Sequence, residues 1–528
     1  MSRWTDGYVA DIGYTHGFYR EMAPAHLALA TASRGAVPPD CDRPFADCEL
    51  GCGQGVTSVL LAAQNPHATF HANDFNPTHV GAARRLAAEA GVTNLTLSDA
   101  SFADYADADL PDFDAVALHG VYSWISAENR AAIRRFLSRR LKVGGVVYLS
   151  YNAMPGWTAG AGLRRLFADL AARPEEPTAL RIERGMALGE RMKAVGAHYF
   201  RFNPGSAERL EKMKTFQRNY FAHEFLNRDW TPFYHVDLAS ELSEAKLTFV
   251  ASANMLDHVD MLNLTAEQQQ LLAEVPDPAV RETLRDYIVN QSFRRDVFVK
   301  GPVPMSGPQT QAIWRGMRFA LTVPREAVSL SIAGPLGEAT LQPETYGPIV
   351  DALAETDEAA SGGRTVSELM GVPAIRAIGA ARLQQALVVM TGAGWIQPCG
   401  SAAREAERRA GAAAFNDAVR ARALASAEIT VQAAAVSGSG VTVDRVGQLF
   451  LRALSGNADD PAEYVTRILR AQGEKMVKDG DVLETPEENA AEIARRWADF
   501  VAGQLPRLRR IGAFEAPAGA ARPTGTMD

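Results

Sequence analysis

Short apolar runs alternate with amphipathic segments between residues 45 and 152. The runs have the length of single strands, and the segments between them place apolar residues at helical spacing. Strands that alternate with helices at this pitch predict βαβ units and a mostly parallel sheet. The expected strands are residues 45–50, 68–74, 95–100, 113–120 and 146–152, and the expected helices are 56–66, 77–91 and 127–145.

Later segments supply two further strands. Helical patterns fill residues 158–234, and residues 247–255 and 292–301 then have the pattern of strands. We therefore predict an α/β fold, in which a Rossmann-like sheet of seven strands carries helical insertions. A smaller region that is winged-helix-like and helical follows it.

Proline and glycine cluster in GPVPMSGP at residues 301–308, which marks a linker. We place a first domain at 1–301, with a helical insertion at about 158–234. Three helical segments and a strand up to residue 398 have the outline of a winged helix. The predicted parts after the linker are a winged-helix-like domain at 302–400, a helical region at 401–515 and a disordered tail at 516–528.

Composition and charge narrow the function. The chain has 528 residues and a net charge of −8, so no overall basic field attracts nucleic acid or an anionic membrane. Residues 302–400 hold six Arg, no Lys and eight acidic residues, which disfavours DNA binding by the winged-helix outline. The four cysteines have neither disulfide nor zinc spacing. Because no apolar segment has the length of a membrane span and no secretory signal is present, we expect a cytoplasmic protein without a metal.

The segment CELGCGQG at residues 48–55 follows the first strand and opens the first helix. Its glycines, Gly51, Gly53 and Gly55, are spaced G-x-G-x-G, whereas the dinucleotide fingerprint is G-x-G-x-x-G. Glu49 at the mouth of this loop would repel a pyrophosphate. It suits the cationic amino group of S-adenosylmethionine (AdoMet), which the loop therefore favours over NAD.

Two further carboxylates stand at strand ends. Asp74 ends the second strand, where it can accept both ribose hydroxyls, and Asp99 follows the third strand, near the expected adenine. Because the carboxyl ends of parallel strands meet at one edge of a sheet, the ordered set predicts a single cofactor site. The predicted cofactor-binding residues are Glu49, Gly51, Cys52, Gly53, Gly55, Asp74, Phe75, Asp99, Ala100 and His119.

The ordered set resembles that of class I AdoMet-dependent methyltransferases. YTHGFYREMAPAHLA, LHGVYSWIS and LKVGGVVYLSYNAMPGW are similar to segments of a narrower bacterial family, and YFAHEFLNRDWTPFYHVDLASELSEAKLTF and QSFRRDVF resemble its methyltransferase regulatory domain, at about 217–301. This family includes bacterial protein-lysine methyltransferases that act on outer-membrane proteins. The resemblance implies AdoMet as the methyl donor, S-adenosylhomocysteine (AdoHcy) as the product and a lysine side chain of a protein as the acceptor.

The residues after strands four and five are expected to border the transferred methyl group. Their aromatic faces attract a sulfonium or ammonium by roughly 0.5–2 kcal/mol each and suit a channel for an aliphatic amine. An amine acceptor is deprotonated by burial and by the neighbouring charge, so an acidic general base is not compulsory. The predicted catalytic residues are His119, Tyr122, Trp124 and Asn152, and Tyr122 and Trp124 have the alternative role of packing the loop.

Other functions stay open. A small molecule or sugar that accepts on a hydroxyl needs a general base, for which His119 is the candidate. Nucleic-acid methylation is disfavoured, because HGVYSW replaces the Asn/Asp-Pro-Pro-aromatic loop that holds a flipped base. A non-catalytic AdoMet-binding regulator is a further alternative. His223 and Glu224 do not form a zinc motif, because HExxH would need a histidine where Asn227 stands. We expect a protein substrate, or else a small molecule, no nucleic acid, and leave open whether the chain forms a homodimer.

Overall fold

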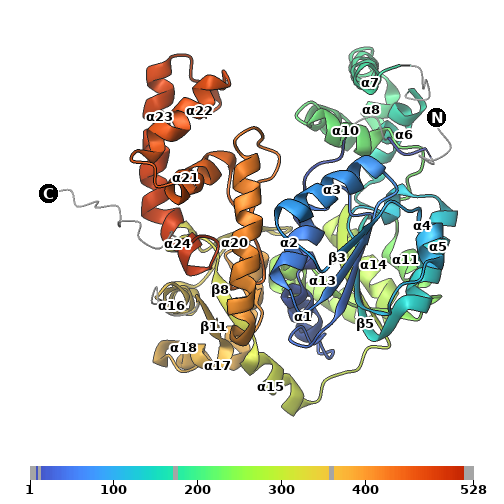
Figure 1. Cartoon of the computed structure of the whole chain (residues 1–528). Helices are drawn as coiled ribbons and strands as arrows, with labels where there is room; N and C mark the ends of the chain where they lie inside the picture. The colour runs from blue at the N-terminus through green and yellow to red at the C-terminus, as the bar shows by residue number, and fades with distance from the viewer. Residues whose placement is uncertain (1–6, 10–12, 171–175, 356–361, 516–528) are drawn as a thin grey trace.

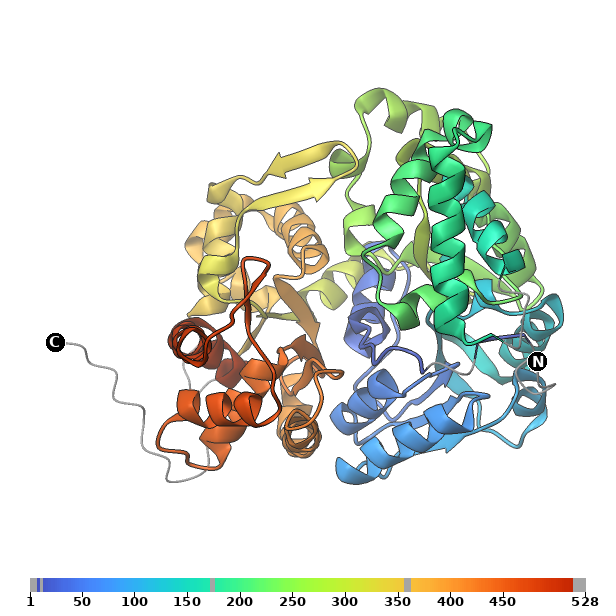
Figure 2. The ribbon, with the colours of Figure 1, turned by 90° about the horizontal axis from the view of Figure 1, so that it is seen from above.

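The structure is a computed structural model of the chain, and it describes residues 7–9, 13–170, 176–355 and 362–515. The predicted tail at 516–528 lies outside the described residues. Two parts lie side by side: the sheet with its helices, which extends to residue 300, and a C-terminal part that begins with α15 (Gly307–Gly316) (Figures 1 and 2).

A seven-stranded sheet forms the centre of the first part, in the order β3-β2-β1-β4-β5-β7-β6. Strands β1 to β5 pair in parallel, and β7 runs antiparallel to both of its neighbours. The predicted α/β class is confirmed, and so is the completion of the sheet by the two late strands. The strands are β1 (Ala46–Leu50), β2 (Thr69–Asn73), β3 (Leu95–Ser98), β4 (Phe113–Leu118), β5 (Leu141–Asn152), β6 (Leu247–Ser252) and β7 (Phe293–Lys300).

Helices cover both faces of this sheet, because side chains alternate between its faces along each strand. In β5, Tyr148 packs on the side of the first three helices, whereas Val147 and Leu149 pack against α5 and α11. The helix that we expected to reach Gly145 ends at Arg140, since the next residue, Leu141, pairs with Phe113 and starts β5. The helices are α1 (Pro24–Ser33), α2 (Val56–Gln64) and α3 (Pro77–Glu89) on one face, and α4 (Phe102–Asp107), α5 (Ala127–Arg140) and α11 (His235–Ser243) on the other.

The segment between β5 and α11 is mainly helical and gathers at one end of the sheet (Figure 1). Phe167, Leu210, Phe221 and Phe225 are fully buried in a core of their own there. After β6 the chain forms α12 (Asp260–Asn263), α13 (Ala266–Ala273) and α14 (Pro278–Val289) and then returns as β7. The helices of the inserted segment are α6 (Thr158–Leu170), α7 (Thr178–Ala194), α8 (His198–Phe202), α9 (Pro204–Met213) and α10 (Arg218–Phe225).

After α15 the C-terminal part forms a three-stranded antiparallel sheet, β11-β8-β12. The three helical segments expected before residue 398 form four helices, because Gly379, with φ +87°, separates α18 from α19. The domain limits drawn from the sequence stay predictions. The elements are β8 (Arg318–Leu321), β9 (Ser331–Gly334), β10 (Gly337–Thr340), α16 (Pro343–Ala354), β11 (Gly363–Thr365), α17 (Val366–Leu369), α18 (Pro373–Ile378), α19 (Ala380–Gly392) and β12 (Ile396–Cys399).

The sequence predicted a helical region at 401–515, but the structure of this region also contains strands. Two short antiparallel hairpins, β13–β14 and β15–β16, interrupt the helices. The elements are α20 (Glu405–Arg422), β13 (Val431–Ala434), β14 (Ser439–Thr442), α21 (Arg445–Ser455), α22 (Pro461–Ala471), β15 (Val477–Lys478), β16 (Asp481–Val482), α23 (Pro486–Asp499) and α24 (Leu505–Arg510).

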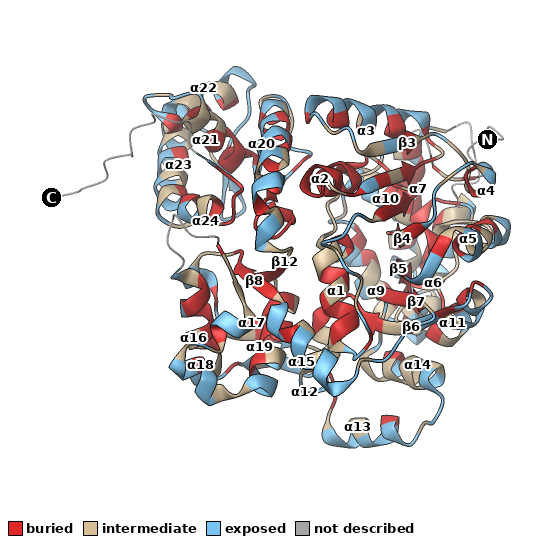
Figure 3. Cartoon of the chain, turned by 60° about the horizontal axis from the view of Figure 1, so that its bottom comes forward, coloured by how far each residue is buried: buried red, intermediate tan, exposed pale blue. Residues whose placement is uncertain are grey.

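Helix α20 packs directly against α2 and joins the two parts of the chain. A Cβ atom at Gly411 would lie 1.9 Å from the carbonyl oxygen of Ala63, so this approach requires glycine. Arg422 Nε lies 2.6 Å from Glu89 Oε2 at the end of α3. As a result every residue of α2 is buried, as the red helix beside α20 in Figure 3 shows.

A buried ion cluster fixes β7 in the sheet. Arg294 Nε lies 2.9 Å from Asp296 Oδ2, and its Nη1 lies 2.6 Å from Asp286 Oδ1. Tyr151 donates to Asp296 at 2.7 Å. Burial raises the pKa of Asp286 to about 7, although Arg294 opposes this effect. Burial would also raise the pKa of Asp296, but Arg294 and the contact with His235 together outweigh it and hold the pKa below its ordinary value.

We predict that Arg294→Met destabilises the sheet domain by about 3–5 kcal/mol, since it leaves buried carboxylates without their cation. Arg295→Met is the matched control, because Arg295 is its neighbour in the strand, is about one third exposed and lies 3.9 Å from Glu21. It should cost about 0–1 kcal/mol. Urea unfolding measures both, and equal losses for the two variants would contradict the assigned role of the cluster.

Candidate cofactor and acceptor site

The loop from Gly51 to Gly55 connects the end of β1 to the start of α2, and its conformation requires glycine. Gly51 and Gly55 have φ angles of +75° and +71°, which side chains disfavour. A Cβ atom at Gly51 would lie 2.6 Å from Val121 Cγ2, and one at Gly55 would lie 2.4 Å from the Cβ of Ala83. The glycines therefore bring β1, α3 and the segment after β4 close together.

Most of the N–H groups of this loop bond within the protein. Gly51 and Cys52 both donate to the Asn73 carbonyl, at 2.9 Å each. Gly53 donates to Asp74 Oδ2 at 2.9 Å. A pyrophosphate binds through an array of free N–H groups at such a helix start. This loop does not present that array, so it suits a ligand without a diphosphate.

Glu49 is the penultimate residue of β1, just before the loop, and is buried. Ser58 of α2 donates a short hydrogen bond to its carboxylate. Burial raises the pKa of Glu49 to about 7, the Ser58 hydrogen bond opposes this, and Asp74 adds to it. A cationic partner stabilises the ionised form of a carboxyl that is buried in this way, and the amino group of AdoMet is such a partner.

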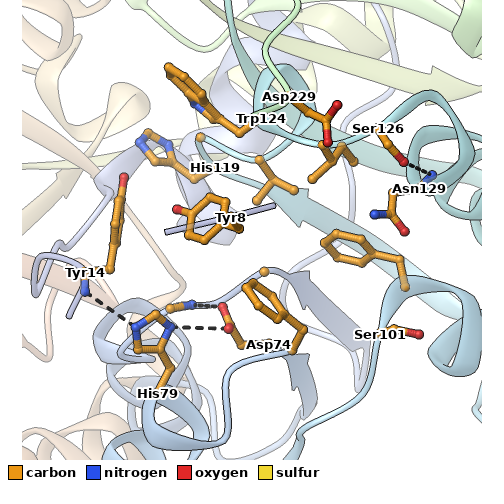
Figure 4. A pocket seen from close by; sticks show the side chains of 17 residues that line it. Tyr8, Tyr14, Asp74, His79, Ser101, His119, Trp124, Ser126, Asn129 and Asp229 are labelled. Atoms are coloured by element: carbon orange, nitrogen blue, oxygen red, sulfur yellow. Dashed lines mark hydrogen bonds and ion pairs between the residues drawn. The ribbon is translucent and has the colours of Figure 1, made fainter. Parts of the chain in front are cut away.

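A cavity of about 330 Å³ opens above the carboxyl ends of β1, β2 and β4. Of the predicted residues, it is lined by Gly51, Gly53, Asp74, Phe75, His119 and Trp124. Figure 4 shows Tyr8 between His119 and Asp74, with Tyr14 beside them. A smaller cavity shares Gly51, Gly53 and His119 with it and is lined by the other predicted residues Glu49, Cys52 and Gly55.

His119 follows β4 and is held on two sides. Its Nδ1 lies 2.9 Å from the Tyr148 hydroxyl, and its ring stacks on Tyr19 with centroids 3.4 Å apart. Burial lowers the pKa of His119 to about 3; Glu21 opposes this, and Arg295 adds to it. The imidazole is thus neutral and a weak base at physiological pH.

Four predicted residues do not line the cavity. Asp99 is exposed, 4.0 Å from Arg84, and Ala100 is its neighbour. Tyr122 is fully buried and donates to Glu241 of α11 at 3.0 Å, which matches the alternative of loop packing. Asn152 is buried beside the segment after β4, where its N–H donates to Ser123 Oγ at 3.0 Å. The roles assigned to these four residues stay predictions.

Sequence reasoning missed part of the lining. Tyr14 stood in a segment quoted only for its family resemblance, and Tyr8 was not singled out, yet both residues line the cavity. His79 was unmarked in α3; it lies 3.3 Å from Asp74 Oδ1 through Nδ1 and accepts from the Tyr14 N–H at 3.5 Å. The further missed residues that line the cavity are Ser101, Phe102, Gly120, Val121, Ile125, Ser126, Asn129 and Asp229.

Comparisons with known proteins agree with this geometry. A family model described as a methyltransferase domain matches residues 48–147, and one described as a predicted methyltransferase regulatory domain matches residues 217–300. The uncharacterized protein sll1526 of Synechocystis sp. is 40% identical over 509 residues, which are 96% of this chain and 99% of that one. The chain belongs to the class I AdoMet-dependent methyltransferases with a methyltransferase regulatory domain.

Two further relatives extend the comparison. The uncharacterized protein RP789 of Rickettsia prowazekii is 25% identical over 291 residues, which are 54% of this methyltransferase and 51% of that protein. The structure of PKMT2 from Rickettsia typhi in complex with AdoHcy matches 95% of this chain and 99% of that one, with a TM-score of 0.65 and 17% identity. At this identity the likeness shows a shared fold over nearly the whole length.

The cofactor of this methyltransferase is AdoMet. The loop geometry fits it, because the site offers a buried carboxylate at Glu49 and a strand-end carboxylate at Asp74 in place of a pyrophosphate cradle. Among the described residues, no cluster of three His, Cys, Asp or Glu side chains is arranged to hold a metal ion. No helix in the described part of the chain has the length and apolar character needed to span a membrane.

We predict that AdoHcy affinity falls as pH decreases below about 7. Protonated Glu49 cannot pair with the ligand ammonium, which stays charged in this range, so each pH unit below the Glu49 pKa costs up to about tenfold in Kd. Glu49→Gln should bind more weakly at pH 8 and show a flat profile between pH 5.5 and 7.5. Titration calorimetry measures both proteins, and an equally steep profile in Glu49→Gln would contradict the role of Glu49.

Proposed function

We propose that this methyltransferase N-methylates lysine side chains of a protein. The observation that carries the proposal is the low basicity of His119, which lines the cavity beside Tyr14 and Trp124. A hydroxyl acceptor needs a general base whose pKa lies near the working pH. An imidazole with a pKa of about 3 does not meet that need, whereas a deprotonated amine attacks without such a base.

The aromatic side chains around His119 also suit an amine. Tyr8, Tyr14, Tyr19 and Trp124 surround the region after β4. Their faces stabilise a cation by roughly 0.5–2 kcal/mol each and pack along an aliphatic chain. The family resemblance seen in the sequence includes bacterial protein-lysine methyltransferases that act on outer-membrane proteins, which supports the same acceptor.

When bound, AdoMet supplies a methyl group on a positively charged sulfur. The protein's task is then to align the acceptor nitrogen and to exclude water, which together can lower the barrier by roughly 7–11 kcal/mol. Gly51, Gly53, Asp74 and Glu49 would hold the cofactor. His119 stacks on Tyr19 and is hydrogen-bonded to Tyr148. This pair would form the side of the cavity against which the acceptor nitrogen packs.

Labelled AdoMet tests the acceptor. The enzyme, incubated with methyl-labelled AdoMet and a bacterial outer-membrane protein preparation, should transfer label to protein, and peptide mass spectrometry should find it on lysine. A parallel incubation with the small-molecule fraction of a cell extract is the control. Label that appears in metabolites or lipids and never on lysine would refute the proposal.

We predict that His119→Gln changes kcat for a lysine acceptor by less than about tenfold, because the neutral imidazole does not act as the base. An O-methylation that used His119 as the base would instead lose about 10²–10⁴-fold. His198 is an exposed residue of α8, and His198→Gln, which serves as the control, should have no effect. Rates are measured at saturating AdoMet, and a loss above 10²-fold in His119→Gln would favour a hydroxyl acceptor.

A further inference from the structure

A further cavity, of about 410 Å³, lies between the regulatory segment, residues 217–300, and the C-terminal part of the chain. Its lining comes from β6, α12, α14 and the start of β7, together with the β9–β10 hairpin and Arg34 after α1. It shares no lining residue with the cofactor cavity. Because cavities of this size commonly hold small molecules, it is a candidate for a second ligand.

The β9–β10 hairpin reaches this cavity from the C-terminal part. A Cβ atom at Gly334 would lie 2.6 Å from the Leu262 carbonyl oxygen of α12, so this close approach requires glycine. Ala333 and Pro335, on either side of Gly334, line the cavity. Figure 2 shows the yellow hairpin extending from the C-terminal part toward the first part. Both parts of the chain therefore contribute to the lining.

One group of lining residues is acidic. The Arg294 guanidinium lies 2.6 Å from Asp286 Oδ1 and 3.1 Å from Glu282 Oε2. It also pairs with Asp296, so one guanidinium serves three carboxylates. Asp286 is 2% exposed, and its Oδ2 accepts no hydrogen bond from the described residues. Buried carboxylates that outnumber their cations are unfavourable, and a cationic ligand group reverses that cost.

Asp257 adds a further carboxylate to the lining. It accepts from Ser252 Oγ at 2.7 Å and from Asn254 Nδ2 at 2.8 Å, and both donors are neutral. Among the described residues it forms no ion pair within 4.0 Å. Its charge is therefore stabilised by hydrogen bonds alone, which strengthens the preference of this group for a cation.

Another group of lining residues is basic. Arg34 and Arg285 both donate to the Asp257 carbonyl oxygen, at 3.4 and 2.9 Å. Arg285 also lies 2.5 Å from Asp260 Oδ1, whereas Arg34 forms no ion pair within 4.0 Å among the described residues. Two guanidiniums that share one carbonyl oxygen repel each other. An anionic ligand group that both can reach removes this repulsion and gains charge-assisted hydrogen bonds.

We propose that this cavity binds a free amino acid, which is a small zwitterion with one ammonium and one carboxylate group. The ammonium binds beside the carboxylates of Glu282 and Asp286. The carboxylate binds to the guanidiniums of Arg34 and Arg285. This inference goes beyond the proposed function and is independent of the methyl acceptor, because none of these residues lines the cofactor cavity.

The separation of the two charged groups favours a zwitterion over a ligand with one charge. An amine without a carboxylate leaves the repulsion between the two arginines in place. A carboxylate without an amine leaves the acidic group short of a cation. Only a ligand that carries both charges complements both groups, and charge-assisted contacts of this kind are the stronger hydrogen bonds in proteins.

Thermal unfolding of the full-length protein tests the site with the common amino acids, one at a time. Saturating AdoHcy is present throughout, because it fills the cofactor site, which itself accepts an amino-acid group. At about 10 mM, at least one amino acid should raise Tm by about 2 °C or more, since a ligand that binds only the folded state stabilises it. The amine that lacks its carboxylate and the acid that lacks its amino group should each give less than half of that shift.

Two variants then locate the bound amino acid. Arg34→Gln and Glu282→Gln should each raise its Kd at least about tenfold in titration calorimetry, because each loses one charge-assisted contact. The matched controls, Arg85→Gln of α3 and Glu274→Gln just after α13, alter exposed residues outside the cavity and should bind as the wild type does. AdoHcy binding verifies that every variant is folded.

Three results would overturn the proposal. They are the absence of a Tm shift with every amino acid, an equal shift with the singly charged analogues, and wild-type affinity in either Arg34→Gln or Glu282→Gln. None of these results bears on lysine methylation, which is measured separately by the transfer of label to protein.

Discussion

One carboxylate holds the cofactor region and the acceptor region together. Asp74 accepts from the Gly53 N–H through one oxygen and from the Asn76 N–H through the other, at 2.9 Å each, so it joins the segments after β1 and β2. Through His79 it reaches the backbone of Tyr14, whose ring meets the His223 ring of α10 edge-on. Protein hydrogen bonds therefore organise the cofactor loop, and the same chain of contacts places the N-terminal tyrosines across the cavity. The distribution of polar groups in the site follows from this frame.

The carboxylates of the site stand apart from an uncharged centre. Glu49 and Asp74 are the residues proposed to complement the ammonium and ribose groups of AdoMet. Beside them lies a region of aromatic rings around a neutral His119. The proposed methyl transfer from sulfonium to amine moves positive charge from sulfur to nitrogen, so uncharged, polarisable walls at the centre match the chemistry. No strong base stands where the methyl group moves, which fits an acceptor that is itself basic.

Local sequence patterns predicted the sheet well, since strands β1 to β4 and helices α2 and α3 follow from apolar periodicity and from stops such as Gly91. They failed where pairing partners decide the structure: residues 141–145 look like a helix end, yet they are the start of β5, in which Leu141 pairs with Phe113 of β4. The hairpin β13–β14 lies in an Ala-, Gly- and Ser-rich segment that follows a long helical pattern, and the sequence analysis did not separate it from the helical region. In the site, the glycine loop and Asp74 were predictable because they directly follow strands. Tyr8 and His79 were not, because they come from separate segments that only the folded chain brings together.

The contact between α2 and α20 changes what counts as the minimal enzyme. Helix α2 starts immediately after Gly55, and α20 covers it so closely that Gly411 touches the backbone at Ala63. The helix that directly follows the cofactor loop is thus covered on its outer side by the C-terminal part of the chain. In evolutionary terms, a gene shortened after β7 would lose this support of the cofactor loop along with the last 228 residues of the chain. Recombination that exchanged C-terminal halves between relatives would have to preserve this glycine and its contact.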